Sequence, residues 1–150
     1  MKFWLLALSV VALDQGTKAL VRKKISPGDS VPVLKGKLHV THVQNRGAAY
    51  GLLAGKPRLL LAGTVGVMVY FAGAFLRRVQ TGKAGPADKA ACALLLGGAF
   101  GNLTDRVKRR QVTDFVHVAC VPQSPVFNVA DAAIFAGAAL YALRKLLEKD

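Results

Sequence analysis

The sequence predicts an all-α membrane protein with four transmembrane helices and a small β-sheet insert at the membrane surface. The chain has 150 residues, of which 53% are hydrophobic. Residues 59–76 (LLLAGTVGVMVYFAGAFL) form an uncharged run of 18 residues, which is long enough to span a membrane as a helix. Three similar apolar segments lie elsewhere in the chain, so a buried helix of a soluble domain is the less favoured interpretation.

The charge is strongly basic and is concentrated where apolar segments end. There are 21 Lys and Arg against 8 Asp and Glu, a net charge of +13. Basic side chains at helix ends reach toward lipid head groups, whereas nucleic-acid binding favours a continuous basic face with interleaved aromatic residues. Membrane lipids are therefore expected partners and nucleic acid is not. The basic clusters are residues 22–24, 77–78, 108–110 and 144–145.

A single membrane domain is expected to cover residues 1–150. The start of the chain resembles a secretory signal peptide, but no small-x-small cleavage site follows, so it is interpreted as a retained first helix. Ser124 and Pro125 form an N-cap and N1 pair that marks the start of the last helix. The four helices are expected at about residues 3–22, 58–77, 86–106 and 124–146.

Two polar inserts separate these helices. Within residues 23–56, the segments 31–34 and 38–43 are typical of a β-hairpin. The substrate-side loop at 107–124 contains VTDFVHV (112–118), which alternates like a strand. Four spans would bring both inserts to one side of the membrane and both termini to the other.

Basic residues are unequally divided between the two sides. The side with the termini carries eight: Lys2, Arg77, Arg78, Lys83, Lys89, Arg144, Lys145 and Lys149. The side with the inserts carries twelve: Arg22, Lys23, Lys24, Lys35, Lys37, Arg46, Lys56, Arg58, Arg106, Lys108, Arg109 and Arg110. Counted alone, this distribution argues that the inserts are cytoplasmic.

Ionisable residues within membrane helices are costly and mark functional candidates. Asp14 and Lys18 are spaced i, i+4 and share a helix face, which favours a supporting salt bridge over direct catalysis. Asn102, Asp105 and Arg106 share another face near the end of the third helix. Arg106 can either pair with Asp105 or clamp an anionic or carbonyl group of a substrate, and the spacing leaves both open.

The candidate catalytic pair is Asp114 and Asp131. Asn128 and Asp131 are spaced i, i+3 at the entry into the last apolar segment, where an unpaired carboxylate is expensive. Asp114 lies in the strand-like 112–118 segment, which the topology brings to the same membrane face. Two carboxyl groups held close together share a proton, so one can activate water while the other polarises a peptide carbonyl.

Other hydrolytic chemistries have little support. The histidines His39, His42 and His117 show no zinc-ligand spacing, and no Ser or Cys lies in a nucleophile motif with a base. Neither a metal nor a cofactor is expected. Cys92 lies in an apolar run and Cys120 in a loop, so a disulfide between them is not expected.

Five segments together resemble the lipoprotein signal peptidase (signal peptidase II) family. Their order and spacing match over nearly the whole chain, and five in this order are far more specific than any one. They are DQGTK at 14–18, NRGAAYG at 45–51, GGAFGNLTDR at 97–106, VTDF at 112–115 and FNVAD at 127–131.

The resemblance implies a membrane aspartyl endopeptidase that removes the signal peptide from diacylglyceryl-modified prolipoproteins, cutting just before the lipidated cysteine. It assigns the catalytic dyad to Asp114 and Asp131. It also implies a location in the bacterial inner membrane, with cytoplasmic termini, the active site toward the outer, periplasmic face, and globomycin as the inhibitor class. A monomer is expected, although the sequence itself carries no signal for the oligomeric state. Substrate-binding or supporting roles are implied for Asn45, Asn102, Arg106, Asn128, Asp14 and Lys18.

The implied orientation contradicts the count of basic residues. Small departures from the family pattern, at Tyr50, Thr104 and Thr113, do not touch the proposed dyad but can affect substrate preference. The main rival is a transporter or channel subunit that uses Asp14, Asp105 and Asp131 as ion sites. Such a protein distributes charges through the bilayer depth and often has internal repeats, whereas this sequence shows neither. A lipid-binding or assembly factor is a weaker third option.

Overall fold

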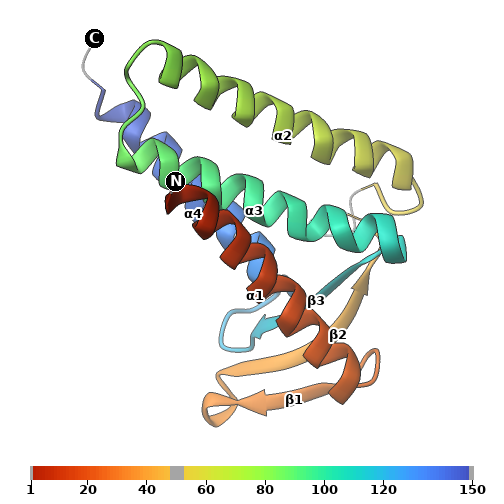
Figure 1. Ribbon diagram of the computed structural model, residues 1–150. Helices are drawn as coiled ribbons and strands as arrows, with labels where there is room; N and C mark the ends of the chain where they lie inside the picture. Colours follow the sequence, from red (N-terminus) through yellow and green to blue (C-terminus); the bar gives the residue numbers. More distant parts are fainter. Residues whose placement is uncertain (1, 48–52, 149–150) are drawn as a thin grey trace.

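A computed structural model describes residues 2–47 and 53–148, and Figure 1 shows their arrangement. Four long helices and a small sheet make up the fold. The motif segment 48–51, including Tyr50, lies outside the described residues. The helices are α1 (Lys2–Lys24), α2 (Pro57–Gln80), α3 (Pro86–Arg109) and α4 (Val129–Leu146), with a short 3-10 turn at Leu34–Gly36. The strands are β1 (Ser30–Val33), β2 (Leu38–Asn45) and β3 (Val112–Val118).

The three strands form one antiparallel sheet in the order β1-β2-β3. The hairpin predicted within residues 23–56 is therefore confirmed, and the strand-like 112–118 segment joins it as the third strand. Between β2 and β3 the register shifts between Val40 and Val43, which indicates a bulge. Beyond this bulge Val43 pairs with Asp114 and Asn45 with Val112, so the sheet carries β3 across to the helices.

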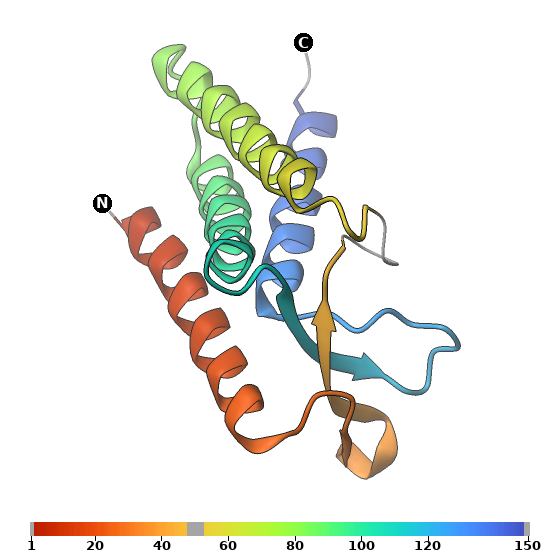
Figure 2. The ribbon, with the colours of Figure 1, turned by 90° about the vertical axis from the view of Figure 1, so that its right-hand side faces the viewer.

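Helix α3 lies between α1 and α4, and Figure 2 shows the three helices side by side with α2 over α3. Small residues make the close approach possible. A Cβ added at Gly97 of α3 would lie 2.8 Å from the Ala7 carbonyl oxygen, and one at Gly137 of α4 would lie 2.9 Å from that of Ala91. Glycine in α3 and α4 therefore permits close helix packing.

Two helices in the described part of the chain are long and apolar enough to cross a membrane. They are Phe3–Lys24, with a mean hydropathy of 1.3, and Pro57–Gln80, with 2.1. Large apolar side chains also point outward from α2 and α4, such as Val69 and Phe135, which are 66% and 77% exposed. The number of spans stays a prediction.

The start of α4 differs from the prediction. The helix begins at Val129, and its N-cap is Asn128 instead of Ser124. The Phe127 backbone pairs with Val116 of β3, which keeps the preceding segment extended. Ser124 instead donates its hydroxyl to the Val118 carbonyl. The other helices are slightly longer than predicted, and α3 runs to Arg109.

Candidate active site

Asp114 and Asp131 come from different elements and line the same cavity of about 770 Å³. Asp114 lies in β3 and is 2% exposed. Asp131 is half-buried in the first turn of α4. The cavity has polar residues around the two carboxyl groups and apolar walls elsewhere. Its lining residues are Asn45, Asn102, Arg106, Val112, Asp114, Pro125, Val126, Phe127, Asp131, Ala132, Ile134, Phe135 and Ala138.

Asn128 connects the two aspartates directly. Its side-chain nitrogen donates to Oδ1 of Asp114 at 2.6 Å. Its side-chain oxygen accepts from the Asp131 backbone N–H at 2.8 Å, and its own backbone N–H donates to Oδ2 of Asp131 at 3.3 Å. These last two bonds form a capping box, so the local signal that starts α4 also fixes the position of the Asp131 carboxyl group.

Two further asparagines complete the polar shell. Asn102 of α3 donates to Oδ1 of Asp131 at 2.7 Å, and its oxygen accepts from Asn128 at 3.1 Å. Asn45, at the end of β2, donates to Oδ2 of Asp114 at 2.9 Å. Each carboxyl group therefore accepts hydrogen bonds on both oxygens, which restricts its rotation. The structure brings together every asparagine that the sequence singled out.

Burial raises the pKa of Asp114 to about 6 from an ordinary value of 3.8. Loss of solvent is the largest cause, and the nearby charge of Asp131 adds to it. The hydrogen bonds from Asn45 and Asn128 act in the opposite direction, because they stabilise the ionised form. Asp114 therefore exchanges a proton much closer to neutral pH than a carboxyl group in water does.

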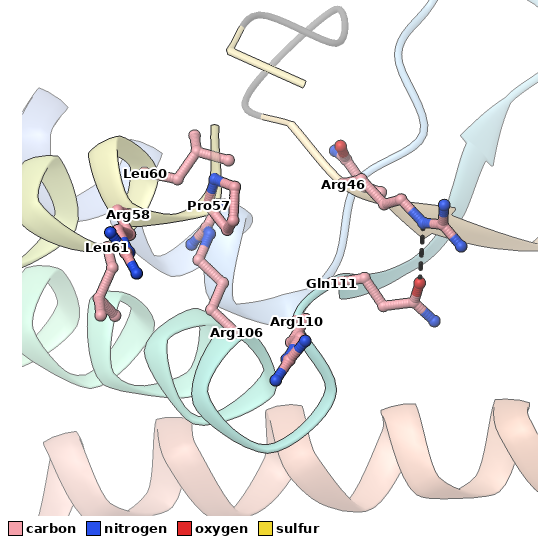
Figure 3. Close-up of a pocket in the computed structure, with 9 residues that line it drawn as sticks. Arg46, Pro57, Arg58, Leu60, Leu61, Arg106, Arg110 and Gln111 are labelled. Atoms are coloured by element: carbon pink, nitrogen blue, oxygen red, sulfur yellow. Dashed lines mark hydrogen bonds between the residues drawn. The ribbon is translucent and has the colours of Figure 1, made fainter. Parts of the chain in front are cut away.

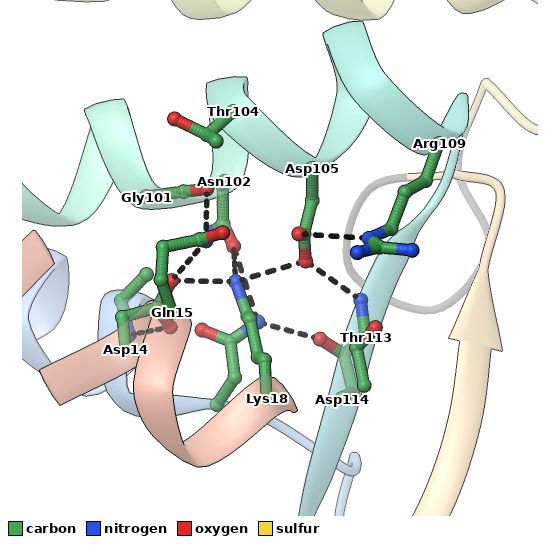
Figure 4. Close-up of polar contacts among 12 residues, drawn as sticks. Asp14, Gln15, Lys18, Gly101, Asn102, Thr104, Asp105, Arg109, Thr113 and Asp114 are labelled. Carbon is green, nitrogen blue, oxygen red and sulfur yellow. Dashed lines mark hydrogen bonds and ion pairs between the residues drawn. The ribbon is translucent and has the colours of Figure 1, made fainter. Parts of the chain in front are cut away.

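Behind the aspartate pair lies a buried ionic cluster centred on the Lys18 amine (Figure 4). Lys18 Nζ lies 2.8 Å from Asp14, 3.3 Å from Asp105 and 2.9 Å from the Asn102 oxygen. Asp14 also accepts from the Ala130 backbone N–H at 3.0 Å, which attaches α1 to the start of α4. The predicted Asp14–Lys18 salt bridge is present, and it supports Asn102 instead of facing the cavity.

Asp105 was expected to pair with Arg106 if Arg106 did not clamp a substrate. It instead accepts from the Thr113 backbone N–H at 3.2 Å and lies within 4 Å of Lys18, Arg22 and Arg109. Arg22 is therefore a supporting residue that was not predicted from the sequence. Its only signal was its position four residues after Lys18, which makes it the third ionisable residue on the same face of α1 as Asp14 and Lys18.

Arg106 is left to face the cavity, where it lies among the residues around Asp114 and Asp131. It also lines two adjoining cavities, one beside Arg46 and Arg58 and one along α2. None of the ion pairs in the described part of the chain includes it. Of the two possibilities that the sequence left open, the geometry leaves Arg106 available to bind a ligand.

A polar cavity that holds two carboxyl groups bonded through one asparagine suits the acid–base chemistry of an aspartic peptidase. Comparison with known proteins gives the particular family. Residues 6–147 match the model of the signal peptidase (SPase) II family. The chain therefore belongs to the signal peptidase II family, which consists of aspartic-type proteases.

Curated relatives and solved structures agree with this family. The lipoprotein signal peptidase of Geobacillus thermodenitrificans is 40% identical over 92% of this chain and 85% of its own length. That of Anoxybacillus flavithermus is 41% identical over 93% and 82%. Two structures described as bacterial membrane enzymes superpose with TM-scores of 0.86 and 0.85, at 31% and 30% identity. They cover 97% and 99% of this chain and 87% and 94% of their own. The protein is a membrane protease.

Proposed function

We propose that this protein removes the signal peptide from diacylglyceryl-modified prolipoproteins by cutting just before the lipidated cysteine, with Asp114 and Asp131 as the catalytic pair. The observation that carries the proposal is that both carboxyl groups line one cavity and are both bonded to Asn128. The names of the relatives supply the substrate class.

In this mechanism the pair acts with one shared proton. Asp114 holds the proton, because burial and the Asp131 charge raise its pKa to about 6. The ionised Asp131 takes a proton from water, which attacks the scissile carbonyl carbon. Asp114 donates its proton toward the carbonyl oxygen as negative charge develops there. When the tetrahedral intermediate collapses, the proton taken by Asp131 passes to the leaving amine, and a hydroxyl proton of the intermediate returns to Asp114, which restores the pair.

The walls of the site suit an amphiphilic substrate. Phe127, Ile134 and Phe135 give the main cavity an apolar side for the residues of the signal peptide. A neighbouring groove of about 380 Å³ is lined by Leu59, Leu60 and other apolar residues, and it shares Asp131 and Arg106 with the main cavity. An acyl chain on the residue beside the scissile bond can lie there, and Arg106 can donate to a substrate carbonyl.

The proposed placement is the bacterial inner membrane, with four spans and the sheet on the outer face. Asn45 and Asp114 belong to the sheet, so this placement brings the carboxyl pair to the level where outer head groups meet the hydrocarbon. The count of basic residues argues for the opposite orientation. Of the twelve basic residues on the insert side, only Arg22 and Arg109 have a carboxylate partner among the described residues, Asp105, so ion pairing does not remove this conflict and the proposed orientation rests on the family.

Cleavage of a defined substrate tests the proposal. Purified protein is incubated with a diacylglyceryl-modified prolipoprotein and with the same precursor carrying Ser in place of the cysteine. Mass spectrometry is expected to find the cut before the modified residue in the first substrate only. Asp114→Asn and Asp131→Asn should each lower the rate by at least about 1,000-fold. Asp29→Asn, at an exposed loop position, is the matched control. Wild-type rates in either dyad variant would rule out the pair as catalytic residues.

A further inference from the structure

A second cavity of about 320 Å³ lies beside the candidate active site and shares Asn45 and Arg106 with it. Figure 3 shows side chains from α2, the end of α3 and the sheet lining the space. Its distinguishing feature is a concentration of arginine. The lining residues are Asn45, Arg46, Pro57, Arg58, Leu60, Leu61, Arg106, Arg110 and Gln111.

Four guanidinium groups converge on this cavity from separate places in the fold. Arg46 directly follows β2, Arg58 lies in the first turn of α2, Arg106 lies in the last turn of α3, and Arg110 caps that helix. None of the described lining residues is acidic. Like charges gathered in this way repel one another, so the cavity favours an anion.

Of the five other arginines in the described residues, all but Arg77 have a carboxylate partner. Arg22 and Arg109 lie within 4 Å of Asp105, and Arg78 lies 2.7 Å from Asp88. The four cavity arginines form no ion pair with any described residue. The positive charge of this cavity is therefore not neutralised within the described fold.

The surroundings supply additional donors. Helix α2 has 24 residues and begins at Pro57, and its N-cap, Lys56, makes no side-chain capping bond. Pro57 has no N–H group, and the N–H groups of Leu59 and Leu60 donate to the Lys56 carbonyl, so this end of the helix contributes mainly its partial positive charge. Arg46 Nε donates to the Gln111 side-chain oxygen at 3.5 Å, which leaves the amide N–H groups of Gln111 to donate elsewhere.

The apolar part of the wall indicates what kind of anion fits. Pro57, Leu60 and Leu61 line the cavity where α2 enters its apolar run, and Leu61 is 37% exposed on the helix surface. A phosphate held by the arginines would be next to an apolar surface at the membrane interface. This combination suits a phosphate attached to acyl chains, whereas an acidic peptide segment would leave the apolar wall uncovered.

We propose that this arginine cavity binds the phosphate group of an anionic phospholipid. The planar guanidinium group of arginine can donate two parallel N–H bonds to phosphate oxygens. The acyl chains would follow the outer surface of α2 into the bilayer. Because Arg106 lines both this cavity and the main one, the bound lipid would form one wall of the active site. The binding itself does not depend on the proposed peptidase activity.

Native mass spectrometry of the full-length protein in detergent tests the proposal. The probes are phosphatidylglycerol, phosphatidylcholine with the same acyl chains, and inorganic phosphate as a competitor. Wild type should bind phosphatidylglycerol at least about tenfold more tightly than phosphatidylcholine. The double variant Arg58→Gln/Arg110→Gln should lose about tenfold or more of that affinity. Lys24→Gln/Lys108→Gln removes two exposed charges on the same side outside the cavity and should stay within about twofold of wild type.

The variants separate site loss from misfolding. Arg58→Lys/Arg110→Lys keeps the charge and should retain more phosphatidylglycerol than the Gln pair, provided both elute as the wild type does. Equal binding of the two lipids would overturn the proposal, as would an equal loss in the control pair. Displacement of the lipid by equimolar inorganic phosphate would show that free phosphate is the ligand. If the Gln pair binds lipid as the wild type does but cleaves only acidic substrates more slowly, the ligand of the cavity is an acidic peptide segment. Either result contradicts a lipid site.

Discussion

The side-chain nitrogen of Asn128 lies 2.6 Å from Oδ1 of Asp114, across the junction between α4 and β3. Asn128 is fully buried, and its other side-chain atom caps α4 at Asp131. The same asparagine thus begins a helix and fixes the relative positions of two carboxyl groups. Helix capping and site geometry cannot be changed independently here.

Replacing Asn128 is therefore expected to damage both activity and stability. In Asn128→Ala, Asp114 loses one hydrogen bond and Asp131 loses its capping partner, so kcat should fall by roughly 100-fold or more with a smaller change in KM. Loss of the cap should also lower the free energy of unfolding by about 1 kcal/mol. Ser124→Ala, at the position where the cap was first expected, is the control. Equal damage from both variants would contradict the role of Asn128.

The pKa of Asp114 should respond in opposite directions to its two kinds of neighbour. Removing the Asp131 charge in Asp131→Asn should lower the pKa from about 6, because that charge destabilises the ionised form. Removing the Asn45 hydrogen bond in Asn45→Ala should raise it, because that bond stabilises the ionised form. Carboxyl ¹³C NMR titration measures both shifts. An unchanged pKa in both variants would show that burial alone sets the value.

Lys18 is expected to be essential for folding. Removing the ammonium group in Lys18→Met leaves Asp14 and Asp105 buried without that partner, which should cost about 3–5 kcal/mol. Thermal unfolding in detergent measures the loss. The double variant Asp14→Asn/Lys18→Met should recover part of it, because one uncompensated charge is gone. If the double variant loses as much unfolding free energy as Asp14→Asn and Lys18→Met lose together, the two residues are not coupled.

Gly101 tests how closely α3 packs against the ionic cluster. A Cβ at this position would lie 2.6 Å from Oδ2 of Asp14, so Gly101→Ala must displace the carboxylate that holds Lys18 and the start of α4. We expect a loss of about 1–3 kcal/mol in unfolding free energy. Gly16→Ala, in α1, has no atom within 4 Å of the added carbon and should be neutral or stabilising. A reversal of this order would contradict the packing.

The sequence predicted most of the fold because its signals are local. Long apolar runs located α1 and α2, a hairpin pattern located β1 and β2, and alternation located β3. The start of α4 was wrong because Ser124-Pro125 is a valid local cap pair, whereas the true start depends on Phe127 pairing with Val116, which is remote in sequence. Capping chemistry indicates possible helix starts, and tertiary pairing selects among them.

The candidate site was likewise predicted where its signals are local and missed where they depend on tertiary contacts. Helical spacing correctly put Asp14 and Lys18 on one face. It could not reveal that Lys18 also contacts Asp105 and Asn102, because those contacts depend on which helices are neighbours. For the same reason, spacing alone could not decide whether Arg106 pairs with Asp105. The second, arginine-lined cavity was also not predicted, since its four arginines come from three separate parts of the chain.

The central claim is that Asp114 and Asp131 act as a pair that shares one proton, and the pH dependence of cleavage tests it most directly. With both carboxyl groups protonated no base is available, and with both ionised no acid is available. The kcat/KM for a diacylglyceryl-modified prolipoprotein should therefore follow a bell-shaped curve whose alkaline limb lies near pH 6, the pKa of Asp114. A rate that instead rises through pH 6 to a plateau in alkaline buffer would contradict the shared proton.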